Sequence, residues 1–303
     1  MKKYFFIAAA MLLAATSCTK ESVETEVKNN AEQVTAPVTV RVNDFSITTE
    51  EMPSGGGMTR AAENPADYLG VGAIDLAFYS GGTEVFKTTQ IKGDGTTYST
   101  FGEFSCNLPV GSYTMVVVGR GWFDGDVFTL TSPTAAGYTT ERARETFCAT
   151  QAVNIANTNA VNLNATLNRI VAKLEIISSD NRVEGVSKIR TTYSAGGKSF
   201  NPSTGLATSN TGFVVTNTPS AAVGATIDVG SFVFLATDEQ TVNITIDVLD
   251  TNEDVMFTKY VANVPLKRNR LTVLSGPLFT STAITSSAFQ VETDWLPDNT
   301  VNF

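Results

Sequence analysis

Two aspartates in the segment WFDGDVF are the side chains whose spacing comes closest to a known chemistry. Asp124 and Asp126 flank Gly125, and an Asp-Gly-Asp segment can bind calcium through its oxygen atoms. No further spaced carboxylate and no closing glutamate follow, so the segment is more typical of a solvated hairpin turn. The chain has no histidine, which removes the commonest general base and transition-metal ligand. We therefore expect no enzyme activity, no catalytic residue, no metal site and no cofactor.

Composition narrows the class of protein and its partners. Of the 303 residues, 42% are hydrophobic, which is enough for a sizeable core. The net charge of −9 argues against nucleic acid as a partner, because phosphate binding needs basic patches. Charged residues make up only 17% of the chain, and the serine, threonine, asparagine and glycine that replace them suit strands and turns.

The N-terminus, MKKYFFIAAAMLLAATSC, has the features of an export signal. Two lysines precede an apolar stretch from Phe5 to Ala15, which is too short to span a bilayer and typical of a signal peptide. Small residues then precede Cys18, an arrangement that resembles the lipobox of bacterial lipoproteins. The resemblance implies that residues 1–17 are removed and that the thiol and new amino group of Cys18 are acylated. The alternative is an ordinary secretory leader in which Cys18 has no role.

Residues 18–35 are polar and predict a flexible tether. Beyond the tether, Cys106 and Cys148 both lie in apolar, strand-like segments. An exported protein can oxidise such a pair to a disulfide, and two buried free thiols fit the sequence equally well.

Period-two alternation dominates the chain after the tether. Val38 to Val42 alternate with polar residues, and Phe45 and Ile47 continue on the other parity, which predicts a bulge at Asn43-Asp44. The segment 103–118 predicts a hairpin that turns at PVGS. The continuous apolar run Met115 to Val118 predicts a strand buried on both faces.

A phase change near the middle of the chain predicts a change of sheet. Alternate apolar residues occupy odd positions from Val161 to Leu167 and even positions from Ile170 to Ile176, and a one-residue slip sends side chains to the opposite face. We place a domain boundary at about residue 166. The fold predicted is all-β, with two tandem β-sandwiches of transthyretin-like or Greek-key type, at 36–166 and 167–303.

The loop PSGGGMTRAAENP carries a single basic residue. Gly55 to Gly57 precede Arg60, which is followed by Ala61. A protease needs an extended segment in its cleft, and loop tips with small residues can supply one. The alternative is an exposed loop arginine that is never cut.

These features together resemble the fimbrillin family of Bacteroidetes, the subunits of type V pili. The resemblance rests on the lipobox leader, the tether, the loop with Thr59-Arg60, the two sandwiches and the segments LNRIVAKLEI and PLKRNRLTVLSGPLF. It implies a lipoprotein precursor in the outer membrane, cut by an arginine-specific protease between Arg60 and Ala61. The removable strand lies within residues 35–51, and a strand from another pilin subunit then fills the groove that it leaves.

The resemblance also implies a donor strand near the C-terminus. Phe289, Val291 and Trp295 share one parity in SSAFQVETDW and could insert into the groove of a neighbouring subunit. Equally, Phe289 to Trp295 could be the last strand of the second domain, which would suit a tip or accessory subunit.

We therefore expect a structural and adhesive pilus subunit at the cell surface. The alternative is a permanently lipidated adhesin or glycan-binding module that is not polymerised and that holds glycans or proteins of host or bacterial surfaces. Trp122, Phe123 and Tyr138 are candidates for a glycan platform, although aromatic side chains more often fill a sandwich core.

Overall fold

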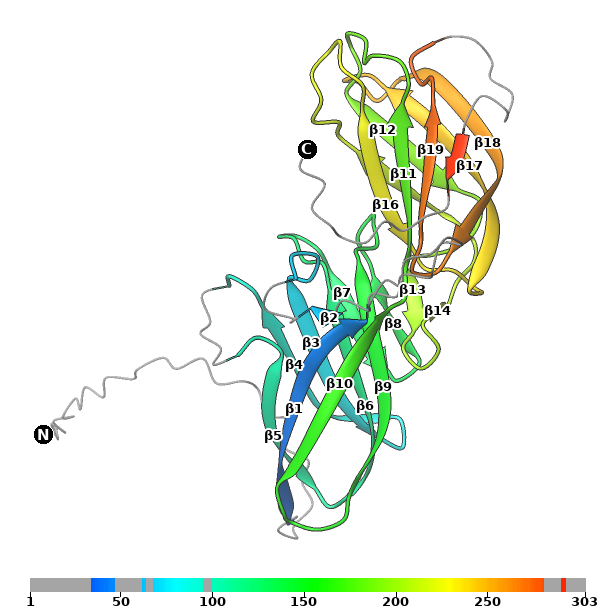
Figure 1. Ribbon diagram of the computed structural model, residues 1–303. Helices are drawn as coiled ribbons and strands as arrows, with labels where there is room; N and C mark the ends of the chain where they lie inside the picture. Colours follow the sequence, from blue (N-terminus) through cyan, green and yellow to red (C-terminus); the bar gives the residue numbers. More distant parts are fainter. Residues whose placement is uncertain (1–33, 47–61, 64–67, 95–99, 281–289, 293–303) are drawn as a thin grey trace, which may run out of the picture. The chain divides into compact units, whose positions relative to one another are not determined.

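Strands provide all the regular secondary structure of the described residues, in agreement with the predicted all-β class (Figure 1). The computed structural model describes residues 34–46, 62–63, 68–94, 100–280 and 290–292. Their strands form four sheets.

The largest sheet, sheet A, runs in the order β5-β1-β10-β9-β6-β3-β4, with β2 also paired to β1. Its strands are β1 (Thr35–Ser46), β2 (Ala62–Glu63), β3 (Ala73–Ser80), β4 (Thr83–Ile91), β5 (Glu103–Pro109), β6 (Gly111–Arg120), β9 (Thr146–Ile155) and β10 (Val161–Arg169). The two ends of the sheet approach each other, because the Gln90 side chain of β4 bonds to the main chain of Gly102 and Glu103, at 2.8 and 2.7 Å. The sheet therefore curves around a first core, whose buried members all lie between Ala36 and Leu167.

Sheet B covers part of the outer face of sheet A. It runs β14-β13-β8-β7 and consists of β7 (Phe128–Ser132), β8 (Ala135–Tyr138), β13 (Ser199–Asn201) and β14 (Leu206–Ala207). A second core lies between these sheets and includes Tyr79, Val118, Tyr138 and Phe200.

Sheets C and D enclose a third core between Ala172 and Phe279. Sheet C runs β16-β11-β19-β20, with β11 (Ala172–Ser178), β16 (Asp228–Val233), β19 (Leu271–Gly276) and β20 (Gln290–Glu292). Sheet D runs β15-β12-β17-β18, with β12 (Lys188–Tyr193), β15 (Phe213–Asn217), β17 (Glu239–Leu249) and β18 (Val255–Lys267). Strict alternation of buried and less buried residues along β11, β12 and β19 fits one face packed on this core.

Several local predictions are confirmed. The register of β1 against β10 shifts between Val42 and Asp44, at the predicted bulge. The phase change at Asn168-Arg169 marks the passage from β10 in sheet A to β11 in sheet C. The run Met115 to Val118 is fully buried because alternate side chains enter the first and second cores.

The predicted hairpin across residues 103–118 is wrong. Both strands form, but β5 pairs with β1, whereas β6 pairs with β3 and β9. Only Val110 separates the two strands, and a tight hairpin needs a loop of at least two residues. The chain instead turns a corner, and both strands direct apolar side chains into the first core.

The predicted domain boundary at residue 166 stays a prediction. The third core lies entirely beyond it and the first core crosses it only with Leu167, but the second core and sheet B contain residues from both sides. The described residues from Val34 onward belong to one compact unit.

Candidate functional site

The first strand, β1, is an interior strand of sheet A, with paired strands along both of its edges. Strand β10 runs parallel to β1 along one edge, from Val38↔Val161 to Ser46↔Asn168. The other edge pairs antiparallel with β5 over Thr35 to Arg41, and with β2 at Phe45 and Ser46. Figure 1 shows β1 in blue beside the green β10, with β5 beyond it. We call the channel that β1 fills, bounded by β5 and β2 on one side and β10 on the other, the β1 slot.

Alternate side chains hold β1 in the slot. The buried members on β1 belong to the first core and are Ala36, Val38, Val40, Val42 and Phe45, each 0–7% exposed. Polar residues between them, such as Arg41, remain accessible. The Arg41 side chain bonds the Glu103 carboxylate on β5 with Nε–Oε2 and Nη2–Oε1 distances of 3.1 and 3.2 Å. The burial of one face therefore dominates the attachment of β1, because an exposed ion pair contributes little.

The aromatic end of the slot is formed around Phe45. Its ring centroid lies 4.8 Å from that of Phe147 and 5.6 Å from that of Tyr68. The rings of Tyr68 and Phe147 meet edge to face at 5.5 Å. Gly119 on β6 makes room for the Phe45 ring, because a Cβ atom there would lie 2.8 Å from Phe45 Cε1.

A polar network continues from this aromatic cluster. The Tyr68 hydroxyl donates to Glu145 Oε1 at 2.7 Å, and Arg169 Nη2 donates to the Tyr68 hydroxyl at 2.7 Å. Arg169 also pairs with Glu145 and donates through Nη1 to Asn269 Oδ1 at 3.2 Å. The end of the slot is thus connected to the turn between β18 and β19.

The residues of the predicted cleavage and lipidation sites lie outside the described residues. Those residues are Cys18, Arg60 and Ala61. Strand β2 begins at Ala62, the residue after Ala61, and pairs with the end of β1. Residues 62–63, which start one residue beyond Ala61, therefore form part of the slot's edge.

Of the three donor candidates, only Val291 lies within the described residues, because Phe289 and Trp295 are outside them. The backbone of Val291 belongs to β20 and pairs antiparallel with Leu274 of β19. The chain thus uses this part of the C-terminal segment in its own sheet C.

The two cysteines in the described residues are free thiols. Burial raises the pKa of Cys106 to about 11 and that of Cys148 to about 12. The Cys148 thiol donates to the Pro202 carbonyl at 3.6 Å. Of the two alternatives left open by the sequence, the structure has the free thiols.

The other sequence candidates are dispersed. The Asp124–Asp126 segment forms a turn, in which Asp126 N donates to Phe123 O, but not the predicted solvated hairpin turn, because it connects β6 of sheet A with β7 of sheet B. The Asp126 carboxylate binds Arg144 at 2.7 and 2.8 Å and its side chain is only 6% exposed. Tyr138 lies in the second core, whereas Phe123 is 59% exposed. Within the described ranges, no group of three or more His, Cys, Asp or Glu side chains is placed to hold a metal ion.

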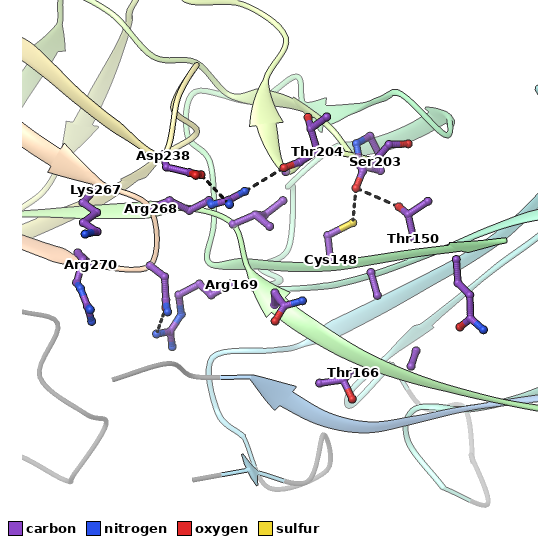
Figure 2. A pocket seen from close by; sticks show the side chains of 18 of the residues that line it. Cys148, Thr150, Thr166, Arg169, Ser203, Thr204, Asp238, Lys267, Arg268 and Arg270 are labelled. Atoms are coloured by element: carbon purple, nitrogen blue, oxygen red, sulfur yellow. Dashed lines mark hydrogen bonds and ion pairs between the residues drawn. The ribbon is translucent and has the colours of Figure 1, made fainter. Parts of the chain in front are cut away.

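A polar hollow of about 880 Å³ lies on the face of β10 that is turned away from the first core. Asn164, Thr166 and Asn168 line it, while the intervening Ala165 and Leu167 belong to the first core. Figure 2 shows how the side chains around this hollow bind one another: Thr150 Oγ1 donates to Pro202 O at 3.0 Å, and Arg268 pairs with Asp238 at 2.7 Å. These contacts occupy several of its polar groups.

No helix able to cross a membrane occurs in the described part of the chain. Sequence comparison with curated proteins gives no match. A protein-family model described as a family of unknown function, DUF6562, matches residues 38–298.

Solved structures share this fold at low sequence identity. A "putative adhesin" from Bacteroides ovatus is 13% identical, with a TM-score of 0.50 over 88% of this chain and 97% of that chain. The fimbrial anchor protein Mfa2 from Porphyromonas gingivalis is 10% identical, with a TM-score of 0.50 over 80% of this chain and 90% of that chain. The predicted resemblance to fimbrial proteins is therefore confirmed at the level of the fold.

Proposed function

The chain belongs to the DUF6562 family, and from this premise and its fimbrial fold we propose that it is a structural and adhesive pilus subunit. It is exported as an outer-membrane lipoprotein acylated at Cys18, cut between Arg60 and Ala61, and assembled by strand exchange. Its partners are an arginine-specific maturation protease, other pilin subunits and surface glycans or proteins. It is not an enzyme.

One observation carries this proposal: β1 lies in sheet A between β5 and β10, two strands that do not adjoin it in the sequence. Both neighbours are joined to it by non-covalent contacts: main-chain pairing, side-chain packing and the exposed Arg41–Glu103 ion pair. Removal of β1 would leave unpaired edges on β5 and β10 and expose the first core. Such edges are templates for a strand from another chain, and a head-to-tail contact that does not close produces a filament.

A second candidate function is supported by the pairing of β20 with β19. Because Val291 is already held in sheet C, a donor strand would have to leave its own domain or begin beyond it. A tip or accessory subunit, lipidated permanently and not polymerised, needs no such release. Its adhesive surface would then act without strand exchange.

Treatment of the purified precursor with an arginine-specific protease tests the proposal. We expect one cut after Arg60 in the wild-type chain, followed by ladders of high mass in native gels. The variants Arg60→Ala and Arg60→Lys should stay uncut and monomeric, and the second of these preserves the charge. Assembly by either variant would refute the site, and a wild-type chain that is cut but stays monomeric would favour the second candidate.

The lipid anchor is tested separately. Cells that express the wild-type chain should retain it in the membrane fraction, and mass spectrometry should find an acylated Cys18 as the first residue. The variant Cys18→Ser should be lost from that fraction. An unmodified wild-type N-terminus would refute the anchor and would leave the strand-exchange proposal untouched.

A further inference from the structure

We propose that the β1 slot selects its incoming strand by one aromatic side chain, placed opposite Leu167 of β10 and beyond a set of four small apolar side chains at alternate positions. The inference rests on the proposed strand exchange and specifies the chemistry of the strand that the slot accepts. In this structure β1 itself occupies the slot and provides the template, with Phe45 as the aromatic residue.

The first four positions of the slot accept small side chains. They are filled by Ala36, Val38, Val40 and Val42, which follow one another at the period of two that places side chains on one face of a strand. The bulge adds one residue to β1 between Val42 and Asp44, whereas β10 continues without one, so the fifth buried residue is Phe45, opposite Leu167.

The fifth position differs from the others in size and shape. Phe45 is fully buried, and its ring packs against those of Phe147 and Tyr68. A Cβ atom on Gly119 would lie 2.8 Å from Phe45 Cε1 and 3.1 Å from Leu167 Cδ1, so the absence of a side chain there creates the space for the ring. Truncation of a buried phenylalanine is among the costliest core changes, because both burial and packing are lost.

The exposed polar residues of β1, of which Arg41 is the example, should contribute little to the selection of the incoming strand. The bidentate pair of Arg41 with Glu103 joins β1 to β5, and its side chains are 48% and 31% exposed. Exposed pairs contribute little to stability. Arg41 therefore provides a matched control within the same strand.

The test needs a chain that can be cut without reliance on Arg60. A recognition sequence for a different, site-specific protease is inserted between Ser54 and Gly55 of the full chain. After cutting, the resident strand is exchanged in mild urea against fluorescein-labelled peptides of residues 34–47, and binding is followed by fluorescence anisotropy. The peptides are the wild type, Phe45→Ala and Arg41→Ala.

We expect the wild-type peptide to bind and the Phe45→Ala peptide to bind about 100-fold more weakly or worse. The Arg41→Ala peptide should bind within about fivefold of the wild type. Equal binding of the wild-type and Phe45→Ala peptides would overturn aromatic selection and leave strand exchange standing. If no peptide binds, including the wild type, strand exchange itself fails.

A complementary change on the receiving side sharpens the test. In a Gly119→Ala chain the wild-type peptide should lose at least about tenfold in affinity, because the new methyl group occupies the place of the ring. A Phe45→Leu peptide should lose less on this chain than on the unaltered one. An unchanged peptide preference would contradict the role of Gly119, and the peptide series on the unaltered chain decides the proposal if this variant does not fold.

Discussion

Replacement of Val40 by asparagine tests whether β1 is held by the burial of alternate side chains. Val40 is 0% exposed and lies in the first core, so the change removes roughly 1.5–3 kcal/mol of side-chain burial. The amide that replaces it would be buried without a partner, at a cost of about 1–3 kcal/mol. The expected loss in the free energy of unfolding is therefore about 2.5–6 kcal/mol.

The neighbouring residue provides the control for this experiment. Thr39 lies on the opposite face of the strand and is partly exposed, so Thr39→Asn should change stability by no more than about 0.5 kcal/mol. In differential scanning calorimetry, Val40→Asn should lower the melting temperature by roughly 5–24 °C, and Thr39→Asn by a few degrees at most. In addition, Val40→Asn should bind a hydrophobic dye and oligomerise without proteolysis, since a loosened β1 exposes the slot. Equal melting temperatures for the two variants would refute the idea that one face of β1 holds it in place.

Three further outcomes follow from the same structure. Asp75→Asn should lower the free energy of unfolding measured in urea by about 3–5 kcal/mol, because Asp75 and Arg120 form a 2.7 Å pair with side chains 6% and 7% exposed. Glu103→Gln, which changes the exposed pair with Arg41, should lower it by under about 1 kcal/mol. Equal losses for the two variants would contradict the larger contribution of the buried pair. Cys148 should resist iodoacetamide from pH 7 to pH 9, because burial raises its pKa to about 12 and the reactive thiolate forms only near or above that value; rapid labelling of the folded protein would contradict its burial. Cys106, with a pKa raised to about 11, should also react slowly at pH 8, and both thiols should react fully in denaturant.

The faces of the strands could be predicted from the sequence, whereas their partners could not. Alternation and its interruptions indicated the bulge after Val42, the sheet change after Asn168 and the doubly buried run from Met115. These features depend on which side of a strand is apolar, and a local pattern encodes that directly. Strand partners depend on contacts between distant segments, so the pairing of β1 with β5 and β10 was not foreseen. The hairpin expected around Val110 failed for the same reason.

The candidate site was only partly visible in the sequence. The alternation of β1 indicated a strand, and its removable character came from the family resemblance alone. The contact of Phe45 with Gly119 was missed, although the sequence carried a signal for it. Gly119 directly follows the apolar run from Met115 to Val118, and a glycine inside a strand often marks close approach of another group. The network of Tyr68, Glu145 and Arg169 had no such signal, because its members are far apart in the chain.

The position of β1 in the chain explains how a single cut could change both the anchoring and the assembly of this protein. A strand that has other strands both before and after it along the sequence would need two cuts for its release. β1 is the first strand of the described fold, and it is followed by the loop that carries Arg60. A cut after Arg60 would therefore separate residues 18–60, with the proposed lipid and the strand together, from the rest of the chain. The released subunit would lose its membrane anchor in the same step that opens the slot, so a free subunit would always be one that needs a new strand.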